Sequence, residues 1–130
     1  MRHAELLIAL AGHDARRLRA LLAEVKALGD RTTSEATAEL IGSAAKYLDA
    51  PWFAAVLGIW REVLDQKPLY FAIAWNAAVA HADANALAAA QLAAARFPDD
   101  TAFAEELAYL KAVVAGRSAA PAAARGPGAP

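Results

Sequence analysis

The chain has 130 residues, of which 58% are hydrophobic, and its 13 basic and 14 acidic side chains give a net charge of −1. This length suits one domain with a real core, and the near-neutral charge provides no general field that would attract nucleic acid or an anionic membrane. The absence of cysteine excludes disulfides, thiolate metal sites and thiol catalysis, but leaves the compartment open.

Alanine supplies much of the hydrophobic fraction, and alanine is the best helix former. The longest apolar runs, 52–60 and 69–75, are well short of the roughly 18 residues that indicate a membrane-spanning helix. The composition therefore predicts an all-α protein without a membrane span.

Two helices are predicted before residue 30. The first covers residues 4–11 and is broken by Gly12 and His13, and the second runs from Asp14, a good cap, to Leu28, with Gly29 as its stop. The basic cluster on the second helix is interpreted as part of its polar face.

A third helix is expected to begin at a capping box, Thr32-x-x-Glu35, with Ser34 as a rival cap, and to run to about Leu48. Asp49-Ala50-Pro51 then turns the chain into the next helix. Two helices joined so tightly form an antiparallel hairpin.

The fourth helix, between Asp49 and Pro68, is the most apolar and aromatic-rich segment. Pro51 suits its first turn, Pro68 stops it, and its large apolar residues fill an arc of roughly 160°, wider than the roughly 100° stripe of a surface helix. We expect it to bury against more than one neighbour. Gly58 in its interior indicates either a close backbone approach or an incidental glycine.

Three further helices complete the pattern. They cover 69 to about 82, 86–97 and 101–115, with Pro98 and Gly116 as stops. Residues 117–130 form an Ala/Pro/Gly tail without a large apolar side chain, and this composition predicts disorder.

Three helix-to-helix turns carry an aspartate, at Asp14, Asp49 and Asp83, and these positions are spaced by 35 and then by 34 (49 − 14 and 83 − 49). A shift of 35 places core positions of the second helix over those of the fourth, for example Leu18 over Phe53. The spacing indicates a repeat of helix pairs.

Helix pairs of this period resemble the tetratricopeptide repeat family. Ala44-x2-Tyr47 and Trp60-x2-Val63-x4-Pro68 match parts of its pattern, while Ala90-x2-Ala93-x4-Pro98 lacks the aromatic residue and the interval from Pro68 to Pro98 is shorter than the period. The resemblance implies stacked antiparallel α-hairpins in a short right-handed solenoid of about seven helices. Its domain would span 1–116, with hairpins at about 2–29, 34–67 and 69–97 and a last helix at 101–115. The alternative is an irregular helical bundle.

No catalytic or cofactor-binding constellation is found. His3, His13 and His81 have no H-E-x-x-H arrangement for zinc, and the acidic pairs Glu35/Glu39 and Glu105/Glu106 fall early in helices, where carboxylates stabilise the helix dipole. The sequence therefore predicts neither an enzyme nor a metal or cofactor site.

The resemblance implies a binding module in which the first helices of the hairpins present a groove to a protein or peptide. Its candidate contacts are Ser43, Lys46, Asn76 and Lys111, although Asn76 is more simply explained as a solvated or intrahelically bonded amide. The three tyrosines are expected in the core or at its rim. The alternative function is a structural or oligomerisation segment, or a fragment of a longer helical-repeat protein, with the seventh helix as a polar cap.

Overall fold

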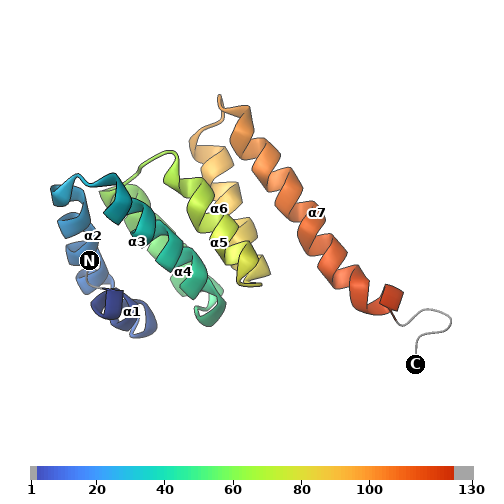
Figure 1. Ribbon diagram of the computed structural model, residues 1–130, viewed down its shortest axis with the longest axis horizontal. Coiled ribbons are helices and arrows are strands. Elements are labelled where there is room, and N and C mark those ends of the chain that lie inside the picture. Colours follow the sequence, from blue (N-terminus) through green and yellow to red (C-terminus); the bar gives the residue numbers. More distant parts are fainter. Residues whose placement is uncertain (1–2, 125–130) are drawn as a thin grey trace.

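The structure is a computed structural model that describes residues 3–124, with side chains placed through Arg117. Every regular element in this range is helical, as the composition predicts (Figure 1). The elements are α1 (His3–Ala11), α2 (Ala15–Leu28), α3 (Arg31–Ala44), the 3-10 turn η1 (Ala45–Tyr47), α4 (Ala50–Val63), α5 (Leu69–Val79), α6 (Asp83–Arg96) and α7 (Thr101–Ala124).

The helices alternate between two rows. The odd-numbered helices pack on one another in the order α1, α3, α5 and α7, and the even-numbered helices pack in the order α2, α4 and α6. In Figure 1 the odd row faces the viewer and the even row lies behind it. The tightest packing joins α3 to α5 and α5 to α6, whereas α3 meets α1 and α2 much more loosely.

The central helix α4 has the broad buried surface that its sequence predicts. Asp49 caps it by accepting a hydrogen bond from the main-chain N–H of Trp52 at 2.8 Å, and a proline occupies its first turn. Both Phe53 and Trp60 are fully buried, and α4 packs against α2 on one side and α6 on the other. Burial against two neighbours is therefore confirmed.

The start of α3 differs from the predicted capping box. Asp30 is the cap: one carboxylate oxygen accepts from the Thr32 N–H at 3.1 Å and the other from the Thr33 hydroxyl at 2.7 Å. Glu35 instead pairs with Arg31 on the helix surface. Because the aspartate satisfies the first free N–H groups, the helix begins earlier than a threonine cap allows.

The glycine that permits a close helix approach is Gly42, in the buried contact between α3 and α5. A Cβ at Gly58 would meet nothing within 4 Å, so Gly58 is incidental. The packing of α3 on α5 thus depends on a glycine whose role the sequence pattern does not reveal.

The turns after α1 and α5 repeat the same backbone structure. His13 and His81 both adopt left-handed conformations, with φ of 54° and 63°, and their positions differ by 68 (81 − 13), which is twice 34. In both turns the residue after the histidine donates its N–H to the carbonyl five positions earlier, at 2.9 Å, which is the hydrogen bond of a Schellman cap. When the two turns are superposed by this recurrence, the position equivalent to Asp14 is Ala82 and not Asp83.

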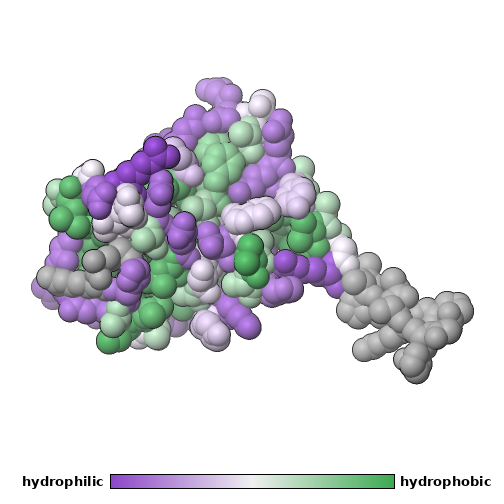
Figure 2. Space-filling model, viewed as in Figure 1, coloured by the Kyte–Doolittle hydropathy of each residue, from purple (hydrophilic) through white to green (hydrophobic). Residues whose placement is uncertain are grey.

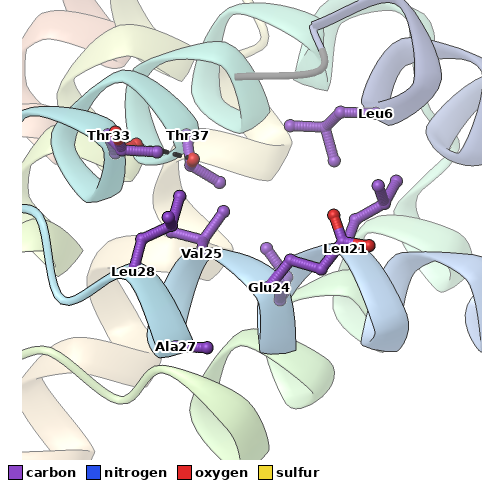
Figure 3. Close-up of a pocket in the computed structure, with 9 residues that line it drawn as sticks. Leu6, Leu21, Glu24, Val25, Ala27, Leu28, Thr33 and Thr37 are labelled. Atoms are coloured by element: carbon purple, nitrogen blue, oxygen red, sulfur yellow. Dashed lines mark hydrogen bonds between the residues drawn. The ribbon is translucent and has the colours of Figure 1, made fainter.

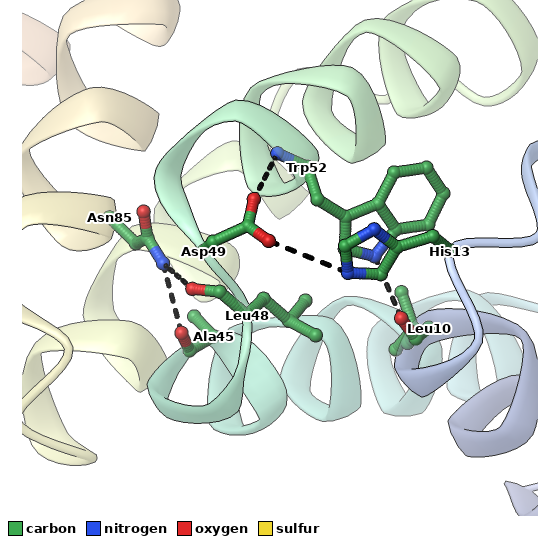
Figure 4. Close-up of polar contacts among 7 residues, drawn as sticks. All are labelled: Leu10, His13, Ala45, Leu48, Asp49, Trp52 and Asn85. Atoms are coloured by element: carbon green, nitrogen blue, oxygen red, sulfur yellow. Dashed lines mark hydrogen bonds and ion pairs between the residues drawn. The ribbon is translucent and has the colours of Figure 1, made fainter.

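Side chains from later helices bond to main-chain carbonyls near the ends of the odd helices (Figure 4). Trp52 Nε1 donates to the Leu10 carbonyl at 2.7 Å, and Asn85 Nδ2 donates to both Ala45 and Leu48 at 2.9 Å. Arg117 makes a similar bond to the carbonyl of Ala78 at 2.9 Å, and it also pairs with Asp83. Each bond joins a helix end to the following part of the stack.

The last helix continues past its predicted end. The sequence predicts a stop at Gly116 and disorder over residues 117–130, but α7 runs to Ala124, and residues 125–130 lie outside the described range. A helical glycine costs only about 1 kcal/mol relative to alanine, and the alanine-rich sequence that follows favours helix. The Arg117 bonds to Ala78 and Asp83 also hold this part of the helix in place.

Candidate interaction surface

Three of the four predicted partner contacts are exposed. Ser43, Lys46 and Lys111 all face solvent, whereas Asn76 is half-buried and its Nδ2 donates to the Ala72 carbonyl of its own helix at 2.8 Å. Asn76 therefore makes the hydrogen bond within its own helix that was the alternative explanation for this residue. Within residues 3–124, no hydrogen bond or ion pair joins any two of these four side chains to each other.

Exposed large hydrophobic side chains collect on the odd row instead. Of the seven such side chains in the described range, six belong to α1, η1, α5 and α7. We use the term odd-row surface for four of them: Tyr47, Trp75, Val79 and Tyr109. Figure 2 shows the face that the odd helices present, with apolar side chains over α5 and α7 among hydrophilic ones.

Trp75 and Tyr109 of this surface contact each other. Their rings stack with centroids 6.0 Å apart and planes 21° apart, and Trp75 is 47% exposed. A second stack supports the same pair of helices, since the ring centroids of Phe71 and Phe103 lie 4.2 Å apart. The exposed aromatic pair is thus fixed on two rigid helices.

Tyr47 is the last residue of η1, which follows α3, and it is 81% exposed, the largest exposed fraction in this group. The ammonium group of Lys46 lies 5.8 Å from its ring centroid, within the range of a cation–π contact. Lys46 therefore belongs beside the odd-row surface, as a neighbour of Tyr47.

A polar network ties the end of α4 to α5 and α6. Asp65, at φ 41°, accepts a 2.6 Å hydrogen bond from the Tyr70 hydroxyl and a 2.7 Å bond from Arg96. Burial raises the pKa of the Asp65 carboxyl, but these bonds outweigh it and hold the pKa below its usual value. Burial, followed by the bond to Asp65, raises the pKa of Tyr70. These groups are bonded to one another and join the end of α4 to α5 and α6.

One carboxyl on α7 has an unusual environment. Glu106 Oε1 is buried without a hydrogen-bond partner in the described part of the chain, and burial raises the pKa of Glu106 to about 7.

Among the described residues, no group of three or more His, Cys, Asp or Glu side chains is arranged to hold a metal ion. His13 instead stacks on Trp52, with its Nε2 3.5 Å from Asp49.

The sequence patterns did not identify Trp75 and Tyr109 as surface residues, since they placed the tyrosines in the core or at its rim. The composition of α5, LYFAIAWNAAV, contains no charged residue. This composition indicates that the helix exposes some apolar side chain, but it does not say which one. A helix that is apolar on all sides but packed on only part of its surface has to expose apolar side chains.

Comparisons with protein-family models, with curated proteins and with solved structures found no match. No helix in residues 3–124 has both the length and the hydrophobicity needed to cross a membrane. A function must therefore be inferred from the chemistry of the surface itself.

Proposed function

We propose that the chain is a non-catalytic protein–protein interaction module, similar to tetratricopeptide repeats, which binds a protein or peptide through the odd-row surface. The observation that carries this proposal is the stacked and half-exposed pair Trp75 and Tyr109. Tryptophan and tyrosine are enriched among the residues that dominate binding energies, because they bring a large contact area at a small cost in side-chain entropy.

Three features support the family-like architecture. The helices alternate between two rows, the turns after α1 and α5 recur at twice the spacing between Asp49 and Asp83, and later helices bond to the ends of α1, η1 and α5. In tetratricopeptide repeats the first helices of the hairpins line the binding groove, and here the odd helices occupy that position in the chain. Ser43, Lys46 and Lys111 remain candidate polar contacts beside the aromatic pair.

The test begins with capture of partners on the immobilised chain, followed by affinity measurements on a purified partner. Trp75→Ala and Tyr109→Ala should each weaken binding by about thirtyfold or more, as expected for central aromatic contacts. Lys46→Ala should produce a smaller loss. Gln91→Ala, at an exposed position on α6 in the even row, is the matched control and should bind like the wild type.

Unchanged affinity in both aromatic variants would contradict the proposal. Light scattering over a range of concentrations separates it from the structural alternative. If the chain dimerises and Trp75→Ala makes it monomeric, the odd-row surface serves a second copy of the chain rather than a different partner.

A further inference from the structure

The two exposed rings at the contact of α5 with α7, Trp75 and Tyr109, have acidic neighbours on α7. Side chains three or four residues apart lie next to each other on a helix. The residues at these positions before Tyr109 are Glu105 and Glu106, and those at the same positions after it are alanine and valine. Around Trp75 the equivalent positions hold phenylalanine, alanine and valine. The surroundings of the pair on their own helices are therefore apolar or negative.

Glu106 lies between two pairs of stacked rings. It is three residues after Phe103 and three before Tyr109, so it faces the same side of α7 as both. The Phe103 ring stacks on Phe71 of α5. The Tyr109 ring stacks on Trp75, one turn further along the same helix. The Glu106 side chain therefore projects from α7 toward α5, next to the exposed aromatic pair.

The carboxylate of Glu106 has no counter-charge. Its Oε1 atom is buried and accepts no hydrogen bond from the described residues, although the side chain as a whole is only half-buried. Glu105, one residue earlier, is exposed to solvent. A cation placed beside an ionised carboxylate that is partly withdrawn from water stabilises its charge. The two glutamates thus offer a favourable position for a positive group.

The basic side chains near this contact are directed elsewhere. Lys111 is two residues after Tyr109, which places it on nearly the opposite side of α7. Arg117 is paired with an aspartate at the start of α6, at 2.6 Å. Lys67 forms a 2.9 Å ion pair with Asp100, just before α7 begins. Within the described residues, none of these three cations pairs with the two glutamates.

The chain itself holds a cation over another ring of the odd-row surface. The ammonium group of Lys46 lies 5.8 Å from the centroid of the Tyr47 ring, within the range of a cation–π contact. This pair follows α3, and α5 lies between α3 and α7 (Figure 1). Trp75 and Tyr109 are 47% and 56% exposed, and in the described part of the chain no cation lies over either ring. The aromatic pair is therefore open to a cation from outside the chain.

We propose that a lysine or arginine side chain of the partner binds against Trp75 and Tyr109, beside Glu105 and Glu106, so that the odd-row surface recognises a basic segment of a protein. The faces of aromatic rings attract cations, and the two carboxylates attract a basic segment and repel an acidic one. This partner chemistry rests on the proposed function, because it belongs to the same surface.

Three decapeptides test the charge of the partner. They share one glycine and serine sequence and differ only at a few fixed positions, which hold lysine, norleucine or glutamate. Calorimetric titration of the whole chain at low salt and about pH 8, where Glu106 with its pKa of about 7 is mostly ionised, gives the affinities. The lysine peptide should bind at least about tenfold more tightly than the norleucine peptide, and the glutamate peptide should bind most weakly. Equal binding of the lysine and norleucine peptides, or no binding of any peptide, would overturn the proposal.

The indole N–H signal of Trp75 in a nuclear magnetic resonance titration locates the bound peptide. Trp52 and Trp60 are buried, so their indole signals serve as internal references, and the Trp75 signal is the one that Trp75→Ala lacks. The lysine peptide should shift the Trp75 signal until it saturates and leave the other two in place. A saturable shift at the buried indoles alone would place the peptide elsewhere and overturn the proposal.

Truncation of either ring should weaken binding of the lysine peptide. Trp75→Ala and Tyr109→Ala should each lower its affinity by about tenfold. The matched control is Leu28→Ala, which also removes an exposed apolar side chain. Leu28 lines a cavity of about 450 Å³ between α1, α2 and the start of α3 (Figure 3), and this cavity shares no residue with the odd-row surface. Leu28→Ala should therefore bind like the wild type.

Variants of the two glutamates test the source of the selectivity. Glu105→Gln combined with Glu106→Gln should bring the affinity of the lysine peptide close to that of the norleucine peptide, which should itself not change. Glu62→Gln, at an exposed position on α4 in the even row, controls for a change in net charge and should bind like the wild type. A preference for lysine that survives in the double variant would overturn the role of the carboxylates.

The outcomes separate the basic partner from the proposed function. Suppose that a captured protein loses affinity in Trp75→Ala while the lysine and norleucine peptides bind equally: the odd-row surface would then remain a binding site, and only the cation would be wrong. Unchanged affinity of the lysine peptide in both Trp75→Ala and Tyr109→Ala would overturn its position on the surface as well. If circular dichroism shows that one aromatic variant does not fold, the other variant decides.

Discussion

Gly42 of α3 lies so close to Ile73 of α5 that a Cβ on the glycine would be 2.6 Å from the Ile73 carbonyl oxygen. The same Cβ would be 2.7 Å from the Cβ of Asn76 and 3.2 Å from the main-chain nitrogen of Ala77. Two of these atoms belong to the backbone of a packed helix and cannot move aside as the end of a flexible side chain can. The separation of α3 and α5 is therefore set by backbone contact.

Gly42→Ala should destabilise the fold by about 1 to 3 kcal/mol, the usual cost of overpacking a tight interface. The matched control is Gly58→Ala, at an open helical position, which should instead stabilise by about 0.4 to 1 kcal/mol. Urea denaturation of both variants gives the two free energies. A stabilising Gly42→Ala would show that α3 and α5 are further apart than described.

Asn85 provides a second prediction, because one amide group satisfies the carbonyls of both Ala45 and Leu48. Asn85 is 7% exposed, so that Asn85→Ala removes the amide donor from the Leu48 carbonyl and leaves the Ala45 carbonyl with only the Leu48 N–H, and it should cost about 1 to 3 kcal/mol. Asn76→Ala is the control, since it removes only a bond within one helix and keeps the Cβ that faces Gly42; it should change stability by less than about 0.5 kcal/mol. Equal losses in the two variants would contradict this account of the turn between α3 and α4.

The sequence predicts the helices well because helix periodicity and caps are local. Asp14 caps α2 as expected, Asp49 caps α4 in the same way, and the arc of α4 packs on two neighbours. The roles of Gly42 and Asn85 depend on contacts between segments far apart in the chain, and no local pattern encodes them. The contact of Asp83 also depends on a distant segment, because its carboxylate pairs with Arg117 from α7 and does not cap α6.

The candidate surface was predicted less well than the fold. The predicted contacts were polar residues on the odd helices, and one of them, Asn76, bonds within its own helix. Local sequence could not place Trp75 at the surface, because whether a tryptophan in an apolar helix is covered depends on how far the next helix overlaps it. Here Tyr109 of α7 covers only part of the ring.

Trp60 and Trp75 should respond differently to truncation. Trp60 is fully buried in α4, so Trp60→Ala should cost about 3 to 5 kcal/mol, whereas Trp75→Ala removes a half-exposed ring and should cost roughly 1 kcal/mol. Chemical denaturation monitored by circular dichroism measures both. A Trp60→Ala variant as stable as the wild type would mean that α4 is not packed between α2 and α6 as described.

Glu106 makes the stability of the fold depend on pH. The helix α7 packs on α6, which carries no charged side chain between Asp83 and Arg96, and these two are paired with Arg117 and Asp65. The neighbouring helix α5 has no charged residue, and its only titratable group, the Tyr70 hydroxyl, is bonded to Asp65. Within the described residues, nothing across the interface offsets the charge of an ionised Glu106, and its pKa rises from the ordinary value of 4.5 to about 7.

A pKa that is higher in the folded state means that the folded chain binds the proton more tightly than the unfolded chain. The stability contributed by protonated Glu106 is complete below a pH of 4.5 and is lost as the pH rises through about 7. Glu106→Gln should therefore melt at the wild-type temperature at about pH 4.5 and at a higher temperature than the wild type at about pH 8. Glu105→Gln, at the exposed neighbouring position, should follow the wild type at both values. Because the variants differ from the wild type at one position each, the difference in pH dependence isolates Glu106. A difference in melting temperature that does not change with pH would contradict the burial of Glu106 without a partner.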